Sequence, residues 1–406
     1  MRRGMIVLGA VCLLLTLTPA FAEGADWPQF RGIHRDGVSP ETGLSASWPE
    51  GGPKELMRVK LGEGYSAISV VGDRFYTMYA VVEDDGATEY AAAFNVKDGK
   101  ELWRTAMGPK FDNEFGNGPR ATPTVVDGQM FVLDSTGLFA ALNAKDGAVQ
   151  WKIDFKEKFK METPRFGYST SALVDGDHVI VQTGGAEDNN YVAFDKKTGE
   201  VKWARGSGRA GYNSALAVTV AGAKRYVYVT DKLYCIDEKG EEVWAHDWPQ
   251  GETHAMPIHI APDKIYLSGA EGIGAKLFQV KEDGGKGEAT LLWEQPFMRN
   301  HFSTAVVHDG FIFGFDNATL KAISLETGEM AWGKRGLGKG SLILADGKLV
   351  VLSDRGKLLL VAATGEAYKE LGQVQALEGL CWTAPTLAHG RLYLRNHDEL
   401  VVYSVK

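Results

Sequence analysis

Eight residues with aromatic or cationic side chains recur at comparable places, each a few residues before a short apolar strand. They are Tyr65, Arg120, Tyr168, Tyr212, His254, His301, Lys339 and Trp382. If the strands that follow them surround a common centre, these side chains form a ring at its mouth. Aromatic faces with a few cations suit a planar or anionic ligand, or an acidic peptide. The alternative is that they only fill the mouth and bond to strand-end carbonyl groups, because buried polar groups usually have structural partners.

Two members of this ring could also bind a metal, since a neutral imidazole is a common ligand. No third ligand stands at a suitable spacing from His254 and His301, so a structural role is favoured for both and no metal site is predicted. The chain shows no Ser-His-Asp set and no nucleophile elbow. The glycine-rich stretch from Gly336 to Ser341 is followed by no helical pattern that could present an N-terminus to phosphate. No catalytic residue is predicted.

The elements that position the ring follow from a repeated eleven-residue phrase, clearest from Ala141 to Trp151. It contains a small residue, Asn143, the pair Asp146-Gly147 and a closing tryptophan. Because Asn or Asp bonds to its own nearby backbone and Gly supplies a positive φ, each copy predicts a hairpin with a polar turn. The indole is large enough to fill the seam between neighbouring units. A repeat that cannot bury its own face must stack on its neighbours.

Two markers count the repeats independently. The closing position is occupied eight times, by Met57, Trp103, Trp151, Trp203, Trp244, Trp293, Trp332 and Tyr368. The six tryptophans among them are interpreted as structural docking residues. Tight turns between apolar strands also number eight, from Gly72-Asp73 to His389-Gly390. The first closing strand (Lys54 to Val59) has no hairpin before it, and the last hairpin (Thr383 to Val405) has no closing strand after it.

Joining these two ends completes one unit, which is how a ring of sheets removes its open edges. The predicted fold class is all-β: an eight-bladed β-propeller of four-stranded antiparallel blades over residues 53–406, closed by an N-terminal strand joining the C-terminal blade. Because the tight turns share one face, the longer loops gather on the other face, beside the ring of eight residues. Arg104 to Arg120 and Lys152 to Gly167 are two such loops.

The first 22 residues have the pattern of a secretion signal: Arg2 and Arg3, an apolar run, and the cleavage site Ala20-Phe21-Ala22. They predict a periplasmic or secreted protein. Two alternatives remain: the apolar run is retained as an N-terminal membrane anchor, or Cys12 carries a lipid. Lipidation requires a small residue just before the cysteine, whereas Val11 stands there.

Residues 23–52 are rich in Gly, Pro and Trp and show no period. We interpret them as a cap across the propeller, with Trp27 and Phe30 buried in it rather than facing a ligand. The formal net charge of −8 argues against nucleic acid or anionic lipid as the main partner.

The repeated phrase, small-x-Asp/Asn followed by Thr/Asp-Gly and Trp, resembles the tryptophan-docking repeat of the pyrroloquinoline-quinone-like propellers. That superfamily includes quinoprotein alcohol dehydrogenases and the BamB-like outer-membrane assembly factors. The resemblance covers nearly the whole chain after residue 22. The opening from Trp27 to Gly32 is also similar to exported bacterial propellers of the quinone-repeat type.

The resemblance implies two functions of different classes. The leading one is an exported, non-enzymatic propeller that binds a protein, peptide or small ligand at its loop-rich face as a monomer, with a role in envelope or outer-membrane assembly. The alternative is a dehydrogenase that uses pyrroloquinoline quinone (PQQ) with calcium. In the alcohol dehydrogenases the quinone lies against adjacent bonded cysteines, whereas Cys235 and Cys381 here fall in opposite units, and no C-x-x-C-H haem motif is present. No cofactor is therefore predicted.

Overall fold

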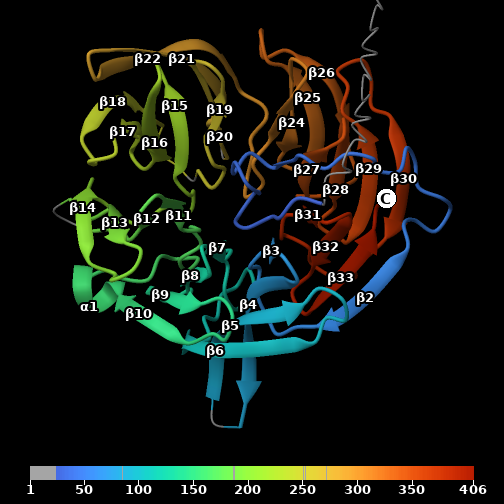
Figure 1. The fold of residues 1–406 in the computed structure, drawn as a ribbon. Helices are drawn as coiled ribbons and strands as arrows, with labels where there is room; N and C mark the ends of the chain where they lie inside the picture. The colour runs from blue at the N-terminus through green and yellow to red at the C-terminus, as the bar shows by residue number, and fades with distance from the viewer. Residues whose placement is uncertain (1–23, 85, 186–187, 250, 252, 271) are drawn as a thin grey trace, which may run out of the picture.

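The computed structural model describes residues 24–84, 86–185, 188–249, 251, 253–270 and 272–406. Within these residues the chain forms strands β1 to β33 and one short helix, α1 (Phe155–Phe159). Figure 1 shows the strands gathered in separate sheets around a common centre. The secretion signal predicted at residues 1–22 lies outside the described residues. In the part of the chain that is described, no helix has the length and apolar character needed to span a bilayer.

Eight sheets form the ring, and each contains four antiparallel strands, which confirms the predicted propeller; one sheet has β1 (Val38–Ser39) as a fifth, parallel strand. Blades 1 to 4 consist of β3 (Ser69–Val71), β4 (Arg74–Glu83), β5 (Gly86–Asn95) and β6 (Glu101–Pro109); β7 (Thr124–Val126), β8 (Gln129–Leu133), β9 (Leu138–Asn143) and β10 (Val149–Asp154); β11 (Leu173–Asp175), β12 (His178–Gln182), β13 (Tyr191–Asp195) and β14 (Val201–Arg205); and β15 (Leu216–Val220), β16 (Ala223–Val229), β17 (Lys232–Ile236) and β18 (Glu242–Asp247).

The second half of the ring repeats this order, with its last blade shared between the two ends of the chain. Blades 5 to 8 consist of β19 (Ile258–Ile260), β20 (Lys264–Gly269), β21 (Gly274–Asp283) and β22 (Lys286–Gln295); β23 (Val306–His308), β24 (Phe311–Asp316), β25 (Thr319–Ser324) and β26 (Met330–Lys334); β27 (Ser341–Ala345), β28 (Lys348–Leu352), β29 (Lys357–Ala362) and β30 (Glu370–Gln375); and β31 (Thr386–Ala388), β32 (Arg391–Arg395), β33 (Glu399–Ser404) and β2 (Glu55–Lys60).

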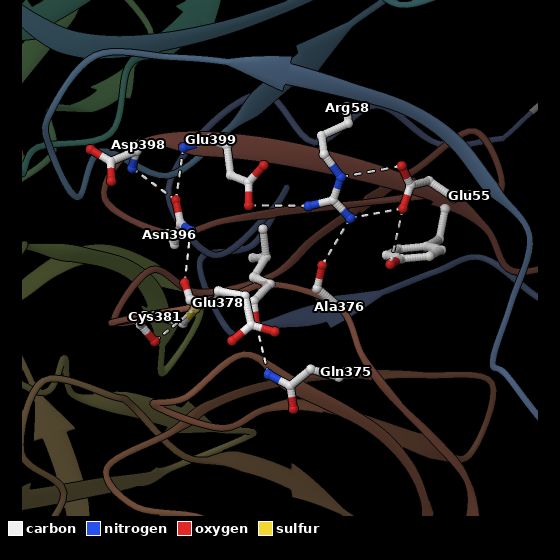
Figure 2. Close-up of polar contacts among 12 residues, drawn as sticks. Glu55, Arg58, Gln375, Ala376, Glu378, Cys381, Asn396, Asp398 and Glu399 are labelled. Atoms are coloured by element: carbon white, nitrogen blue, oxygen red, sulfur yellow. Dashed lines mark hydrogen bonds and ion pairs between the residues drawn. The ribbon is translucent and has the colours of Figure 1, made fainter.

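The ring closes where β2 pairs antiparallel with β33, the closure that the sequence predicts. Arg58 of β2 donates to Glu55 at 2.8 Å and forms an ion pair with Glu399 of β33 at 3.1 Å. Its guanidinium also donates to the carbonyl oxygen of Ala376 at 3.1 Å, in the link that leaves blade 7 (Figure 2). One side chain therefore connects the first strand of the ring, the last strand and the neighbouring blade.

The tight turns account for the hairpins at the start of the blades. Between β7 and β8, Asp127 and Gly128 have φ values of 50° and 76°. Two successive residues with positive φ are what a two-residue type I′ hairpin requires, and Asp-Gly is well suited to it. Asp309-Gly310 and Asp346-Gly347 have the same pair of positive angles. In each of these blades the two residues of the turn therefore determine the hairpin of the first two strands.

The tryptophans of the repeat join each blade to the next. A Cβ built on Gly240 would lie 2.8 Å from the ring of Trp203, so the indole lies directly against the polar turn of the following blade. The indole Nε1 donates to the carbonyl oxygen of Glu238 in that turn at 3.1 Å. Four other indoles donate in the same way: Trp103 to Ala144, Trp151 to Lys196, Trp293 to Leu325 and Trp332 to Thr364. These contacts couple packing and hydrogen bonding at the seams.

Two seams depart from this pattern. Blade 5 has the long hairpin β21–β22 where other blades have the polar turn, and the Nε1 of Trp244 has no hydrogen-bond partner among the described residues. In blade 7 the strand pairing places Gly372 opposite Leu360, the register that tryptophan holds elsewhere. The sequence assigned that register to Tyr368, which was wrong. Trp48 covers Gly372 instead: its backbone N–H donates to Leu371 and its side chain is buried.

Residues 24–54 cross the ring on the side of the tight turns, shown in blue in Figure 1. The carboxylate of Asp26 accepts from the backbone N–H of Gly72 at 2.9 Å and contacts the ring of His389 at 2.8 Å. Trp27, which is 2 % exposed, bridges to β3, and β1 (Val38–Ser39) runs parallel to β27. This segment therefore covers the face opposite the long loops.

Candidate functional site

The long-loop face opens into a central cavity of about 460 Å³. Seven of the eight ring residues line it: Tyr65, Arg120, Tyr212, His254, His301, Lys339 and Trp382. They come from the links that lead into the inner strands of seven blades. In each of these blades the ring residue stands a few residues before the first strand, which lies beside the channel. The repeat thus brings together residues that are far apart in sequence.

Tyr168 was assigned to this ring, and that assignment was wrong. Its side chain is fully buried, and its hydroxyl donates to the carbonyl oxygen of Thr183 at 2.8 Å. In blade 3 Ser169 and Ser171 line the cavity. Successive side chains of an extended segment point to opposite sides. Because Ser169 and Ser171 face the cavity, Tyr168 points away from it into the core. The ring position of blade 3 is therefore Ser169, one residue further along the chain.

Aromatic rings form much of the cavity wall. Tyr65 stacks on Trp382 with ring centroids 5.9 Å apart, and Phe302 lies 5.2 Å from the same indole. On the opposite wall Phe166 lies 5.4 Å from Tyr212. Such rings offer flat apolar faces to a ligand while remaining rigid, since each has only two side-chain torsions.

The charged side chains of the lining are cationic. Arg31, Arg120, Arg165 and Lys339 line the cavity, and no Asp or Glu is among the described residues of the lining; Glu114, outside it, forms an ion pair with Arg165 at 3.0 Å. This contrasts with the whole chain, whose formal net charge is −8. A concave, largely apolar site with cations and no carboxylate concentrates positive potential and favours an anionic ligand.

The N-terminal segment supplies the floor of the cavity. Phe30, expected to be buried in the cap, is only partly buried and lines the cavity together with Arg31. The guanidinium of Arg31 donates to the carbonyl oxygens of Thr304 at 2.9 Å and Ala305 at 2.6 Å. Burial lowers the pKa of Arg31 to about 10, and the nearby charge of Asp36 opposes this shift. Arg31 therefore stays protonated at neutral pH and places a buried positive charge beneath the mouth.

Arg120 has both structural and ligand-facing character. It donates to the carbonyl oxygens of Gly118 and Gly116, the latter at 2.7 Å, and lies over the ring of Phe111. Burial lowers the pKa of Arg120, and the charge of Glu89 opposes that effect. This residue holds the 110–118 loop in place and also contributes its charge to the wall.

His254 is uncharged at physiological pH. Burial, followed by electrostatic repulsion from the neighbouring His301 and Lys339, lowers the pKa of His254 to about 3. The imidazoles of His254 and His301 lie 5.3 Å apart. Within the described residues no group of three or more His, Cys, Asp or Glu side chains could hold a metal ion. The two histidines therefore form a polar part of the wall.

A belt of hydroxyl groups below the ring was not identified from the sequence. The backbone N–H of Thr122 donates to Oγ of Ser171 at 2.9 Å, and that of Ser171 donates to Oγ of Ser214 at 2.9 Å. Across the channel the backbone N–H of Met256 donates to Oγ1 of Thr304 at 2.9 Å. The signal was present as Ser or Thr a few residues after most ring positions. These bonds tie neighbouring inner strands together and fix the cavity walls.

The quinone that the fold resemblance implies would need a calcium ion and an adjacent cysteine pair in the cavity. Cys235 and Cys381 are buried free thiols in blade 4 and in the link to blade 8. Ca²⁺ binds through six to eight oxygen ligands, usually including carboxylates, and the described lining offers no carboxylate. The aromatic and cationic lining suits a planar anion, but the donor set does not fit the calcium and cysteine arrangement of the quinoprotein alcohol dehydrogenases.

The solved structures that resemble this fold include a BamB protein and quinone-dependent dehydrogenases. BamB from Moraxella catarrhalis matches with a TM-score of 0.59 and 17 % identity, over 87 % of this chain and 98 % of that chain. A quinohemoprotein alcohol dehydrogenase from Comamonas testosteroni matches with a TM-score of 0.65 and 13 % identity, over 94 % and 80 %. A europium-containing methanol dehydrogenase matches with a TM-score of 0.53 and 11 % identity, over 93 % and 98 %. At these identities the likeness shows the fold alone.

A search of curated proteins gave no match. A family model described as the outer membrane protein assembly factor BamB matches residues 87–334, which is more than half of the chain. That stretch runs from the second hairpin of blade 1 to the end of blade 6. The chain therefore belongs to the BamB-like family of β-propellers.

Proposed function

We propose that this propeller is an exported, non-enzymatic binding protein that receives an acidic segment of a partner protein at the long-loop mouth. The observation that carries the proposal is the composition of the central cavity, in which aromatic rings and cations converge without any carboxylate among the described lining residues. Membership of a family named for outer-membrane assembly supports a place in the cell envelope.

The shape of the site supports binding of one segment rather than passage of a ligand through the ring. Residues 24–54 cover the opposite face, and Phe30 and Arg31 close the bottom of the cavity. A segment that enters from the loop side would meet apolar ring faces first and the buried charge of Arg31 beneath them. Aromatic and acidic side chains of a partner would be recognised together in this way.

Fluorescence anisotropy with a labelled peptide tests the proposal. The probe carries several Asp and Glu residues around one Trp, and a matched peptide has Lys in place of the acids. We expect the acidic peptide alone to bind the wild-type chain, and the double variant Arg165→Gln with Phe166→Ala to bind it at least roughly tenfold more weakly. Arg335→Gln is the matched control, because Arg335 is exposed and lies outside the cavity lining. Equal binding of both peptides, or equal affinity of the double variant, would contradict the proposal.

A second titration separates binding from quinone chemistry. Calorimetry with PQQ and Ca²⁺ should give no calcium-dependent heat, because the described lining offers no carboxylate ligand. Calcium-dependent binding together with reduction of a dye by alcohols would replace the proposed role with an oxidoreductase.

A further inference from the structure

A smaller pocket opens beside the central cavity on the same face. This side pocket has a volume of about 220 Å³ and is lined by Ala270, Arg299, His301, Asn317 and Lys339. Its residues come from blade 5, from β24–β25 of blade 6 and from the links that lead into blades 6 and 7. His301 and Lys339 line both spaces, so they form a shared wall. The two spaces therefore lie side by side, with the side chains of His301 and Lys339 at their boundary.

The guanidinium of Arg299 is held in a defined orientation. Its Nε donates to Oδ1 of Asp316 at 2.7 Å, and its backbone N–H donates to the same oxygen at 3.1 Å. The other carboxylate oxygen of Asp316 accepts from Lys321 at 2.6 Å. Burial opposes ionisation of Asp316, but the hydrogen bonds from Arg299 and Lys321 outweigh it and lower the pKa of this carboxyl. With Asp316 ionised, the cluster of Arg299, Asp316 and Lys321 carries a net positive charge.

Lys339 adds a further positive charge on the shared wall. No ion pair or hydrogen bond of its ammonium group is found within the described part of the chain; its backbone N–H donates to Asp354 at 3.3 Å. His301, the second residue of the shared wall, lies with its ring 5.3 Å from that of His254. The side pocket thus combines one oriented guanidinium, one ammonium and one imidazole.

We infer that the side pocket binds a tetrahedral oxyanion of the phosphate class, and that the adjoining cavity favours a phosphate monoester carried on an aromatic group. A guanidinium offers paired donors with fixed geometry and an ammonium adds a point charge, and together they match a doubly charged tetrahedral anion better than a single carboxylate. The inference rests on the proposed binding role of the mouth and assigns a chemical class to one part of its ligand.

Calorimetric titration of the full chain at low salt tests the inference with two probes, inorganic phosphate and phenyl phosphate. We expect both to bind and phenyl phosphate to bind more tightly, because its ring can lie against Phe302 and Trp382. Phe302→Ala should bring phenyl phosphate close to the affinity of inorganic phosphate while leaving inorganic phosphate unchanged. Equal affinity of the two probes for the wild type would assign the pocket to free phosphate, and would overturn the aromatic ester.

Two variants of the pocket and one control complete the test. Lys339→Gln and Arg299→Gln should each weaken both probes at least roughly tenfold, the loss expected for one hydrogen bond to a charged group. Arg335→Gln, on the same link as Lys339, should leave both affinities unchanged. If Arg299→Gln fails to fold because Asp316 loses a partner, Lys339→Gln alone decides. No phosphate binding by the wild type, with acidic-peptide binding intact, overturns this inference only; phosphate binding without peptide binding overturns the proposed function only.

Discussion

Trp48 lies against Gly372 at the register where six other blades carry a tryptophan of their own, and a Cβ built on Gly372 would lie 2.7 Å from the Cβ of Trp48. The N-terminal segment thus supplies the large aromatic side chain that blade 7 lacks. It packs there with Leu377 and Ala376 in the core that joins blades 7, 8 and 1.

Removing this indole should be costly. We expect Trp48→Ala to lower the free energy of unfolding by about 3–5 kcal/mol, the usual cost of truncating a large buried aromatic. Tyr368→Ala should cost clearly less, because Tyr368 lies before β30 and is only partly buried, with its ring 5.7 Å from that of Trp332. Chemical denaturation of both variants measures the difference. Equal losses would show that Trp48 does not replace the seam tryptophan.

The hydrogen bond of the docking tryptophans can be separated from their packing. Trp151→Phe removes both indole volume and the bond to the carbonyl oxygen of Lys196, whereas Trp244→Phe removes volume at a site with no such bond in the described residues. We expect Trp151→Phe to be the more destabilising of the two by about 1 kcal/mol, the net worth of a typical hydrogen bond. Thermal unfolding of the two variants, measured side by side, gives the answer. A larger loss for Trp244→Phe would contradict this account of the seams.

Glu89 should make stability depend on pH. Burial, with a further contribution from the charge of Asp134, raises the pKa of Glu89 to about 7, although the N–H groups of Ser135 and Phe111 oppose the shift. A carboxyl with a raised folded-state pKa stabilises the protein below its unfolded pKa and loses that contribution as pH rises toward 7. Glu89→Gln should therefore be more favourable relative to wild type at pH 8 than at pH 5, as judged by urea unfolding. Glu326→Gln, an exposed surface change, serves as the control.

Tyr168 and Tyr212 should respond differently to substitution. Tyr168→Phe loses the hydrogen bond to Thr183 and should cost about 1 kcal/mol of stability without any change in ligand binding. Tyr212→Ala removes a ring from the cavity wall and should weaken the acidic peptide while the chain still folds. Pairing a melting curve with an anisotropy titration for each variant separates the two roles. Weakened peptide binding by Tyr168→Phe would show that Tyr168 contributes to the ligand site after all.

The two thiols should be inert in the folded chain. Burial is the main reason that the pKa of Cys381 rises to about 12, and burial also raises the pKa of Cys235. Because the thiolate is the reactive form, we expect a thiol-specific reagent to label neither residue until denaturant is added. Rapid labelling of native protein would show that one of these sites opens.

The fold was predictable because its signals are local and repeated. Asp-Gly pairs with positive φ set the inner hairpins, and the unmatched strands at the two ends of the chain required closure between β2 and β33. Trp48 could not be predicted, since it lies in a segment without a period and reaches blade 7 only through tertiary packing.

The ring was less predictable because its lining depends on register. A shift of one residue exchanges inward and outward side chains, which is how Tyr168 was chosen over Ser169. Loop residues such as Phe166, and Arg31 from the N-terminal segment, reach the cavity through chain paths that spacing does not encode.

The pairing of β2 with β33 also has a consequence for biosynthesis. β2 emerges from the ribosome long before β33 does, so its outer-blade position has no partner until nearly all of the propeller has been made. During that interval both ends of the growing array present unpaired backbone groups, which invite association with other chains. Pairing of β2 with β33 thus ends this interval, because it completes the last blade and covers the exposed edge of β33.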